Sequence, residues 1–208
     1  MGRPTILRAT GERSAPNGRT TRPVFLTPCF QSLRDSGRHP VDRNAAISAS
    51  DSPIAVLPAG TQAPDFSLNA TPDQALALHE LSGRPVVLVF YPADWSPVCG
   101  DELVLFNTAL PLIAKSGATV LGISVDSVWC HQAFIADRKL GFELLSDFEP
   151  KGAVARRYGA YDAEHGYCKR ALFVIDAQGT IAWSYLSPTA INPGVDGVLD
   201  ALDALPKG

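Results

Sequence analysis

One apolar run and the loop that follows it constrain the fold of this chain most strongly. Residues 85–91 (PVVLVFY) are continuously apolar, which is typical of a strand buried on both faces of a sheet. The loop leads into residues 97–110, where apolar side chains recur at helical spacing. A strand that enters a helix through a short loop is the unit of an open α/β sheet, and such sheets bind ligands beside the carboxyl ends of their strands. The sequence therefore predicts an α/β fold with a functional loop at residues 92–102.

A cysteine, Cys99, lies in the first turn of this predicted helix. The unpaired N–H groups and the positive end of the helix dipole both stabilise a thiolate at such a position. An ordinary cysteine has a pKa of about 8.5, so only about 3% is ionised at pH 7, and this stabilisation increases the reactive fraction. Ser96 supplies a hydroxyl that can accept a hydrogen bond from the helix start or donate one to a thiolate or substrate oxygen. Cys99 is therefore a candidate nucleophile.

The rest of the chain alternates strands and helices. Apolar patterns predict strands at 118–126, 142–147, 170–176 and 181–185, and helices at 127–136, 152–158 and 196–204. Residues 177–179 (AQG) form a hairpin turn between the last two strands. This order predicts a central mixed sheet flanked by helices.

The sequence around Cys99 also resembles a family signature. The pattern Pro92-x-x-x-Ser96-x-x-Cys99 resembles the peroxidatic-cysteine motif of the peroxiredoxins, which carry Thr more often than Ser at the hydroxyl position. Glu102, three residues after the cysteine, matches a further common member of that motif. Arg170 stands at the start of a predicted strand, where peroxiredoxins carry their active-site arginine. This resemblance implies a thioredoxin-like fold with the peroxiredoxin additions.

The resemblance extends over residues 57–205. Residues 63–66 (APDF) are similar to the opening common in the redoxin superfamily. Residues 144–154 look like the alkyl hydroperoxide reductase E branch of the peroxiredoxins, whose members often work with one cysteine. Residues 95–99 (WSPVC) resemble a thioredoxin active site only superficially, because Ser96 replaces the first cysteine and dithiol exchange needs two sulfur atoms.

This resemblance implies a thiol-dependent peroxidase that reduces hydrogen peroxide or organic hydroperoxides. The Cys99 thiolate would attack one peroxide oxygen, giving a sulfenic acid and releasing water or an alcohol. Arg170 would stabilise the thiolate and bind a peroxide oxygen, and Ser96 would position the peroxide. Pro92 would exclude solvent, and Glu102 would orient Arg170. The alternative is a non-catalytic redoxin, a peroxide sensor or chaperone that relays oxidation from the same cysteine to a partner.

The resemblance also implies the partners. They are a peroxide and a thiol reductant, such as thioredoxin or a low-molecular-weight thiol, and the family is compatible with a homodimer. No cofactor is implied. No metal is expected either, because Cys130-His131 lacks the paired spacing of a zinc site.

Three fates of the sulfenic acid stay open. Cys130 follows the predicted strand 118–126, so it is expected at the same sheet edge as Cys99 and is a candidate resolving cysteine. Cys168 is its rival, because it lies two residues before Arg170 and the period of two in a strand would place both on one face. The third fate is direct reduction of Cys99 by an external thiol, which the one-cysteine branch implies.

Residues 1–50 differ in composition from the rest of the chain. They contain eight Arg, no Lys and three acidic residues, a net charge of +5, and no sustained apolar period. They are therefore predicted to be a disordered Arg-rich extension, and residues 51–62 to be a lead-in containing Pro and Gly.

The whole chain has a net charge of −3, which gives no reason to expect nucleic-acid binding. No apolar run is expected to span a bilayer. Its four cysteines do not suggest a disulfide framework, so a cytoplasmic, reducing location is expected. Import into an organelle is the alternative if residues 1–50 are a transit peptide.

Overall fold

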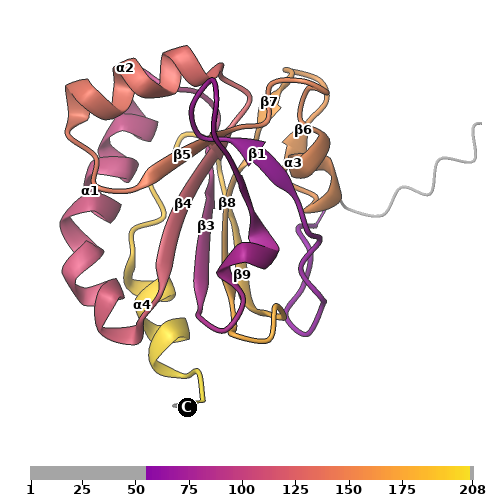
Figure 1. The fold of residues 1–208 in the computed structure, drawn as a ribbon, viewed down its shortest axis with the longest axis vertical. Helices are drawn as coiled ribbons and strands as arrows, with labels where there is room; N and C mark the ends of the chain where they lie inside the picture. Colours follow the sequence, from indigo (N-terminus) through magenta and orange to yellow (C-terminus); the bar gives the residue numbers. More distant parts are fainter. Residues whose placement is uncertain (1–54, 207–208) are drawn as a thin grey trace, which may run out of the picture. The chain divides into compact units, whose positions relative to one another are not determined.

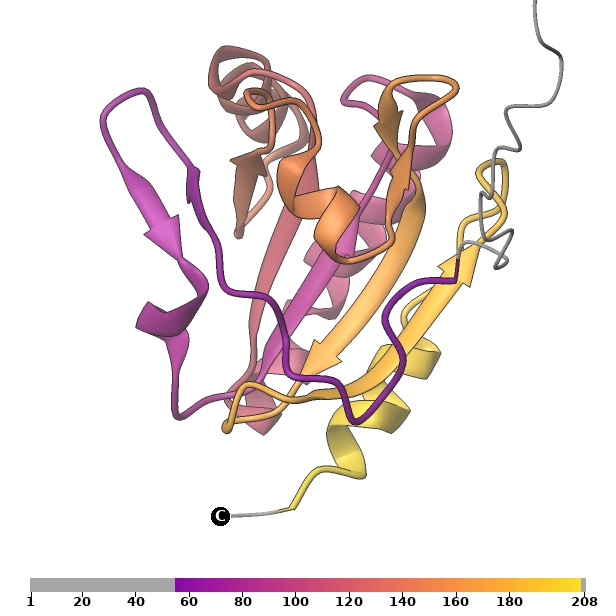
Figure 2. The same cartoon turned by 90° about the vertical axis from the view of Figure 1, so that its right-hand side faces the viewer.

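A seven-stranded mixed sheet forms the centre of the molecule. The computed structural model describes residues 55–206, and the strand order is β2-β1-β5-β4-β3-β8-β9 (Figure 1). The strands are β1 (Ser67–Asn69), β2 (Ala75–Ala77), β3 (Val86–Phe90), β4 (Thr119–Ser124), β5 (Glu143–Ser146), β8 (Arg170–Ile175) and β9 (Ile181–Ser187). Strands β3, β4 and β5 run parallel, and β8 lies antiparallel to β3. Figure 2 shows the β1-β2 hairpin at one edge of the sheet and β9 at the other.

Helices cover both faces of this sheet. They are α1 (Pro97–Ile113), α2 (Val128–Arg138), α3 (Ala153–Arg157) and α4 (Asp196–Asp203), with 3₁₀ turns at Leu78–Leu81 and Ala114–Ser116. One apolar core joins α1, α2 and α4 to Val87 and Val89 of β3, and the other joins α3 to Leu88 and Phe90. Because side chains alternate along a strand, the two cores lie on opposite faces of the sheet (Figure 1).

The predicted α/β fold is confirmed, and the differences lie in short elements. Strands β1, β2, β6 (Tyr161–Asp162) and β7 (Tyr167–Cys168) are absent from the prediction, and β6 pairs with β7 in a separate small sheet. Strands of two or three residues carry too little alternation to be recognised. Strand β9 also runs two residues beyond its predicted end.

Helix α1 and the turn after it are long and apolar enough to cross a membrane. Pro97–Ser116 spans 20 residues and contains an 18-residue window with a mean hydropathy of 1.2, which corrects the expectation that no run reaches this length. Leu103, Phe106 and Ile113 of this stretch are buried in the core against the sheet. A core helix of a globular protein meets the same criterion, so length and composition assign no membrane role.

The predicted extension, residues 1–50, lies outside the described residues, as do the first four residues of the predicted lead-in. From residue 55 onward the lead-in is hydrogen-bonded to the domain. The N–H of Leu57 donates to the Tyr158 carbonyl at 3.1 Å, and that of Gly60 to the Ile181 carbonyl at 2.8 Å. The domain bounds 57–205 stay a prediction.

Candidate active site

The loop between β3 and α1 places Cys99 at the carboxyl edge of the sheet. Strand β3 ends at Phe90, and Ser96 is the N-terminal cap residue of α1. Pro97 therefore takes the first helical position and Cys99 the third, as the sequence predicts. The Cys99 side chain is fully buried within the turn where peptide N–H groups have no partner inside the helix.

A buried arginine contacts this cysteine. Arg170 is the first residue of β8, and its neighbour Ala171 pairs with Phe90 at the end of β3. The Nη2 atom of Arg170 lies 3.4 Å from Cys99 Sγ, and the arginine side chain is only 1% exposed. Because little water screens this charge, the guanidinium is placed to interact strongly with any negative charge that develops at the sulfur.

Two further groups hold the guanidinium of Arg170. Its Nη1 donates to Oε2 of Glu102, and the two side chains form a buried ion pair. Its Nε and Nη2 donate to the carbonyl oxygen of Thr189, at 3.1 and 2.9 Å. The rigid fork of donors in a guanidinium allows partners from separate segments to fix its orientation.

Glu102 is incompletely paired in this site. Its Oε1 is the one buried side-chain oxygen or nitrogen atom of residues 55–206 that has no hydrogen-bond partner. Burial raises the pKa of Glu102 to about 7, while the charge and hydrogen bond of Arg170 act in the opposite direction. Near neutral pH this carboxyl therefore exists in both ionised and protonated forms.

The two remaining predicted site residues lie in the adjoining loop. Pro92 is buried and Ser96 is partly exposed. The Ser96 hydroxyl makes no capping hydrogen bond at the start of α1, so only its predicted role toward a thiolate or substrate is left. The structure thus brings Cys99, Glu102 and Arg170 into one cluster and places Pro92 and Ser96 beside it.

Comparisons with known proteins identify the family. Residues 59–184, more than half of the chain, match the model of the AhpC/TSA family. The chain is also 32% identical over 201 residues to peroxiredoxin Q, chloroplastic, of Oryza sativa subsp. japonica, a match that covers 88% of this chain and 87% of that protein. The chain belongs to the peroxiredoxins.

Two further similarities cover the domain. Peroxiredoxin 2 of Thermoplasma acidophilum is 31% identical over 152 residues, which is 70% of this chain and 75% of that protein. The crystal structure of peroxidoxin BcpB from Mycobacterium tuberculosis matches with a TM-score of 0.67 at 31% identity, over 73% of this chain and 99% of that one. This peroxiredoxin is therefore a thiol-dependent peroxidase with a thioredoxin-like fold, and a non-catalytic role is not favoured. The alkyl hydroperoxide reductase E branch stays a prediction.

Cys168 lies across the sheet from Cys99, the candidate nucleophile of this peroxiredoxin. Its side chain packs in the core that contains α3, whereas Cys99 packs in the core that contains α1 and α2. The chain leaves β7 at Cys168 and begins β8 at Arg170, so the expected common face of these two residues is not formed. Burial is the main cause that raises the pKa of the Cys168 thiol well above its usual range.

Cys130 lies on the same side of the sheet as Cys99. It is half-buried in the first turn of α2, whose Phe134 belongs to the core around Cys99. The Cys130 sulfur lies within 4.8 Å of carboxylate oxygens of Asp94 and Asp126. Burial, followed by the hydrogen bond and charge of Asp94, raises the pKa of Cys130 to about 11. The thiol is therefore protonated in this arrangement.

These three residues also form the one cluster in residues 55–206 that has the geometry of a metal site. Asp94, Asp126 and Cys130 each place one ligand atom within 4.8 Å of the others. The carboxylates already accept hydrogen bonds, Asp94 from the Tyr91 hydroxyl and Asp126 from the Ser124 hydroxyl. These contacts account for the arrangement, so we assign no metal to it.

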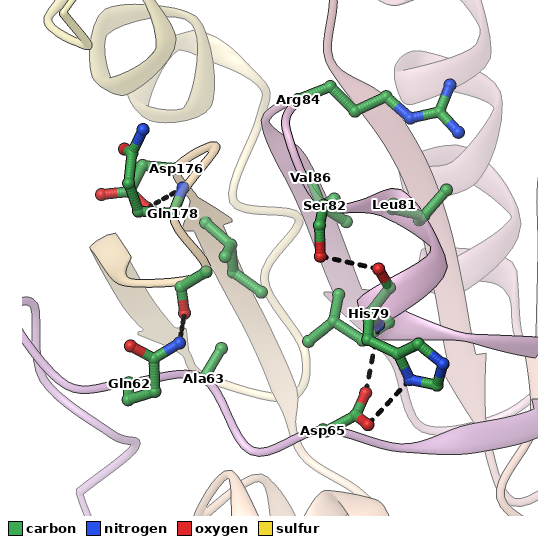
Figure 3. A pocket seen from close by; sticks show the side chains of 13 residues that line it. Gln62, Ala63, Asp65, His79, Leu81, Ser82, Arg84, Val86, Asp176 and Gln178 are labelled. Carbon is green, nitrogen blue, oxygen red and sulfur yellow. Dashed lines mark hydrogen bonds and ion pairs between the residues drawn. The ribbon is translucent and has the colours of Figure 1, made fainter.

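A surface pocket lies at the other end of the central strands. Its lining includes Val86, which begins β3, and Ile175, which ends β8, whereas the active site follows the end of β3. Figure 3 shows the carboxylate of Asp65 paired with the ring of His79, and the hydroxyl of Ser82 donating to the His79 carbonyl. These polar groups satisfy one another, and we assign the pocket no role in the reaction.

Two contacts of the site could hardly be recognised from the sequence. Thr189 holds Arg170 through its main-chain carbonyl, and no side-chain pattern marks such an acceptor. Asp94 is an acidic loop residue of the kind that is usually solvated, yet its side chain is buried and lies 2.9 Å from His131. The sequence feature that could indicate this contact is a carboxylate in the loop together with a histidine in the first turn of the next predicted helix.

The raised pKa of Glu102 implies stability that falls as the pH rises. Its folded-state pKa of about 7 lies above the ordinary value of 4.5, so between these values the folded chain holds a proton that the unfolded chain releases. This stabilisation is fully present below the unfolded pKa and is lost as the pH rises through the folded pKa. Relative to Glu102→Gln, we expect the wild type to lose about 2 kcal/mol of unfolding free energy between pH 5 and 8, measured by urea unfolding. A difference in unfolding free energy between the wild type and Glu102→Gln that does not change with pH would contradict this expectation.

Proposed function

We propose that Cys99 is the peroxidatic cysteine and that Arg170 is its main catalytic partner. The contact of 3.4 Å between Arg170 Nη2 and Cys99 Sγ, in a buried site, is the observation that supports this most directly. A guanidinium in this place stabilises the thiolate and can donate hydrogen bonds to peroxide oxygens. Glu102 and the Thr189 carbonyl serve to orient that guanidinium.

In the proposed reaction the Cys99 thiolate attacks the nearer peroxide oxygen. An S–O bond forms, the O–O bond breaks, and the bonding electron pair leaves with the distal oxygen as hydroxide or alkoxide. Protonation of that oxygen gives water or an alcohol, and the sulfur is left as a sulfenic acid, oxidised by two electrons. Arg170 stabilises the charge on the leaving oxygen, Ser96 donates a hydrogen bond to the peroxide, and buried Pro92 excludes water.

We propose further that Cys130 resolves this sulfenic acid. Cys130 lies on the same side of the sheet as Cys99, whereas Cys168 is packed against the opposite face. The rings of Trp95 and Phe134 are 5.1 Å apart, so α2 contacts the loop that leads to Cys99. The Cys130 thiolate would attack the sulfenic sulfur, forming the disulfide and releasing hydroxide, which is protonated to water. A thiol reductant then restores both thiols.

This disulfide requires a local rearrangement. The Cys99 sulfur contacts Arg170, while the Cys130 sulfur lies beside Asp94 and Asp126. A disulfide forms only when the two Cα atoms are within about 7 Å and the Cβ atoms point toward each other. The first turn of α1 or of α2 is the segment whose opening would allow this.

Oxidation with one equivalent of peroxide, without reductant, tests both assignments. In the wild type we expect peptide mapping to find a disulfide between Cys99 and Cys130, because these thiols share one side of the sheet. In Cys130→Ser we expect a sulfenic acid on Cys99, trapped with dimedone. A disulfide between Cys99 and Cys168 would transfer the resolving role, and first oxidation at a cysteine other than Cys99 would overturn the whole assignment. A stable Cys99 sulfenic acid in the wild type would mean direct reduction by an external thiol.

The reductant, assembly and location are parts of the same proposal. Peroxiredoxin activity needs a peroxide and a thiol reductant, and we propose thioredoxin or a low-molecular-weight thiol as the reductant. Similar proteins include chloroplastic peroxiredoxins of rice and spinach and a mycobacterial peroxidoxin. We propose a cytoplasmic location, with organelle import as the alternative if residues 1–50 are a transit peptide. A homodimer is the proposed assembly, and sedimentation measures it.

A further inference from the structure

A buried contact between two polar side chains joins the loop before Cys99 to helix α2. The Oδ2 atom of Asp94 lies 2.9 Å from Nδ1 of His131, and both side chains are fully buried. Asp94 belongs to the loop between β3 and α1, and His131 to the first turn of α2. Removing such polar side chains from water is unfavourable unless their remaining polar atoms are hydrogen-bonded.

The remaining polar atoms of this pair do have partners. The Tyr91 hydroxyl donates to Oδ1 of Asp94 at 2.8 Å, and Nε2 of His131 lies 3.3 Å from the carbonyl oxygen of Leu145. Both ring nitrogens of His131 therefore face oxygen atoms, so the buried ring is held from two sides.

The main chain of the loop is fixed at the same point. The N–H of Asp94 donates to Oδ2 of Asp126 at 2.8 Å, and that oxygen also accepts from the Ser124 hydroxyl at 2.7 Å. The next residue, Trp95, has φ at 63°, a left-handed conformation that is unfavourable for a residue other than glycine. Such a conformation persists only where its surroundings hold it. Ser96 follows directly and begins the helix of Cys99.

We propose that Asp94 and His131 are positioning residues for the peroxidase reaction. Their buried contact fixes the loop 91–96 and thereby sets where Ser96 and Cys99 lie relative to Arg170. The pair acts through the loop and takes no part in bond making or breaking.

The same pair also affects Cys130, the neighbour of His131 in the sequence. The Asp94 and Asp126 carboxylates lie beside the Cys130 sulfur and contribute to its raised pKa, so the thiol is protonated while the loop is held. Movement of the loop away from α2 takes Asp94 away from that thiol. While the loop 91–96 is held against α2, the peroxide step is therefore favoured and the disulfide step is slowed. This part rests on the proposed resolving role of Cys130.

The variant Asp94→Asn tests the proposal, because asparagine keeps the shape of the side chain but replaces one of its two acceptor oxygens with an NH2 donor and cannot carry a negative charge. We expect the rate constant for Cys99 oxidation by hydrogen peroxide to fall about tenfold or more, since small displacements of reacting groups cost this much. We expect disulfide formation to become about threefold faster, because a larger thiolate fraction outweighs its lower nucleophilicity. Stopped-flow tryptophan fluorescence and acid-quenched peptide mapping measure the two steps separately. General loss of structure would slow both.

Asp65→Asn is the matched control. Asp65 pairs with His79 at the same 2.9 Å, but this pair is exposed and lies in the surface pocket of Figure 3. We expect both rates to stay at the wild-type values in this variant. Thermal unfolding shows whether Asp94→Asn is folded. His131→Gln, which removes the imidazole ring, provides a second variant with the same expected fall in the peroxide step.

Each part of the proposal has its own contradicting result. A peroxide step within about twofold of the wild type in folded Asp94→Asn or His131→Gln would overturn the positioning role. An unchanged or slower disulfide step in Asp94→Asn would overturn the effect on Cys130. If the wild type forms no intramolecular disulfide, the resolving assignment of Cys130 fails, while the peroxide step still decides the role of Asp94.

Discussion

Replacement of Cys99 by serine is expected to abolish peroxide consumption. A serine hydroxyl is not ionised near neutral pH and does not attack peroxide as a thiolate does. Serine is close to cysteine in shape, so the buried contacts around α1 should persist and the fold should be retained. We expect the rate to fall at least about a thousandfold, to that of the uncatalysed reaction, in an assay that follows peroxide directly.

Two other cysteine variants are the controls for this result. Cys29 lies outside the described residues, and Cys29→Ser should leave peroxide consumption intact. Cys130→Ser should still consume one equivalent of peroxide, because the first chemical step does not involve Cys130. Full activity in Cys99→Ser would remove the basis for every role proposed at this site.

Replacement of Arg170 by methionine should have the next largest effect on rate. Methionine fills part of the apolar space of the arginine but provides no charge and no N–H donors. Loss of a preorganised donor costs about 2–4 kcal/mol of transition-state stabilisation, which is about 30- to 1000-fold in kcat/KM. Competition with a peroxidase of known rate measures this constant. A value within twofold of the wild type would exclude Arg170 from the reaction.

The same replacement also leaves Glu102 buried without its cation. An unpaired buried charge destabilises a fold by about 3–5 kcal/mol, and protonation of Glu102 relieves part of this cost. The double variant Arg170→Met/Glu102→Gln removes both charges, so we expect it to regain thermal stability but not rate. Recovery of rate together with stability would mean that the single variant is inactive because it is unfolded.

The parts of this fold that could be predicted are those determined by residues close together in the sequence. The run 85–91 contains β3, and a cysteine placed after Ser96 and Pro97 marks the helix start without any long-range information. The contact between Cys99 and Arg170 could be anticipated because a motif and a strand start identify the two residues.

The parts that could not be predicted depend on pairing between distant segments. Asp94 and His131 are 37 residues apart, and only the folded sheet edge shows that they meet. The expected common face of Cys168 and Arg170 is not formed, because alternation of side chains holds within one strand and the chain changes strands between these two residues.

The carbonyl that holds Arg170 has a consequence for how this site changes in evolution. Thr189 contributes only its main-chain oxygen to the contact, so a different side chain at this position would leave the acceptor of Arg170 unchanged. An insertion or deletion between β9 and α4 would instead move the acceptor. The family match ends at residue 184, before this loop. Among related peroxiredoxins, we therefore expect selection to act on the length and backbone path of this loop, while its amino-acid sequence varies.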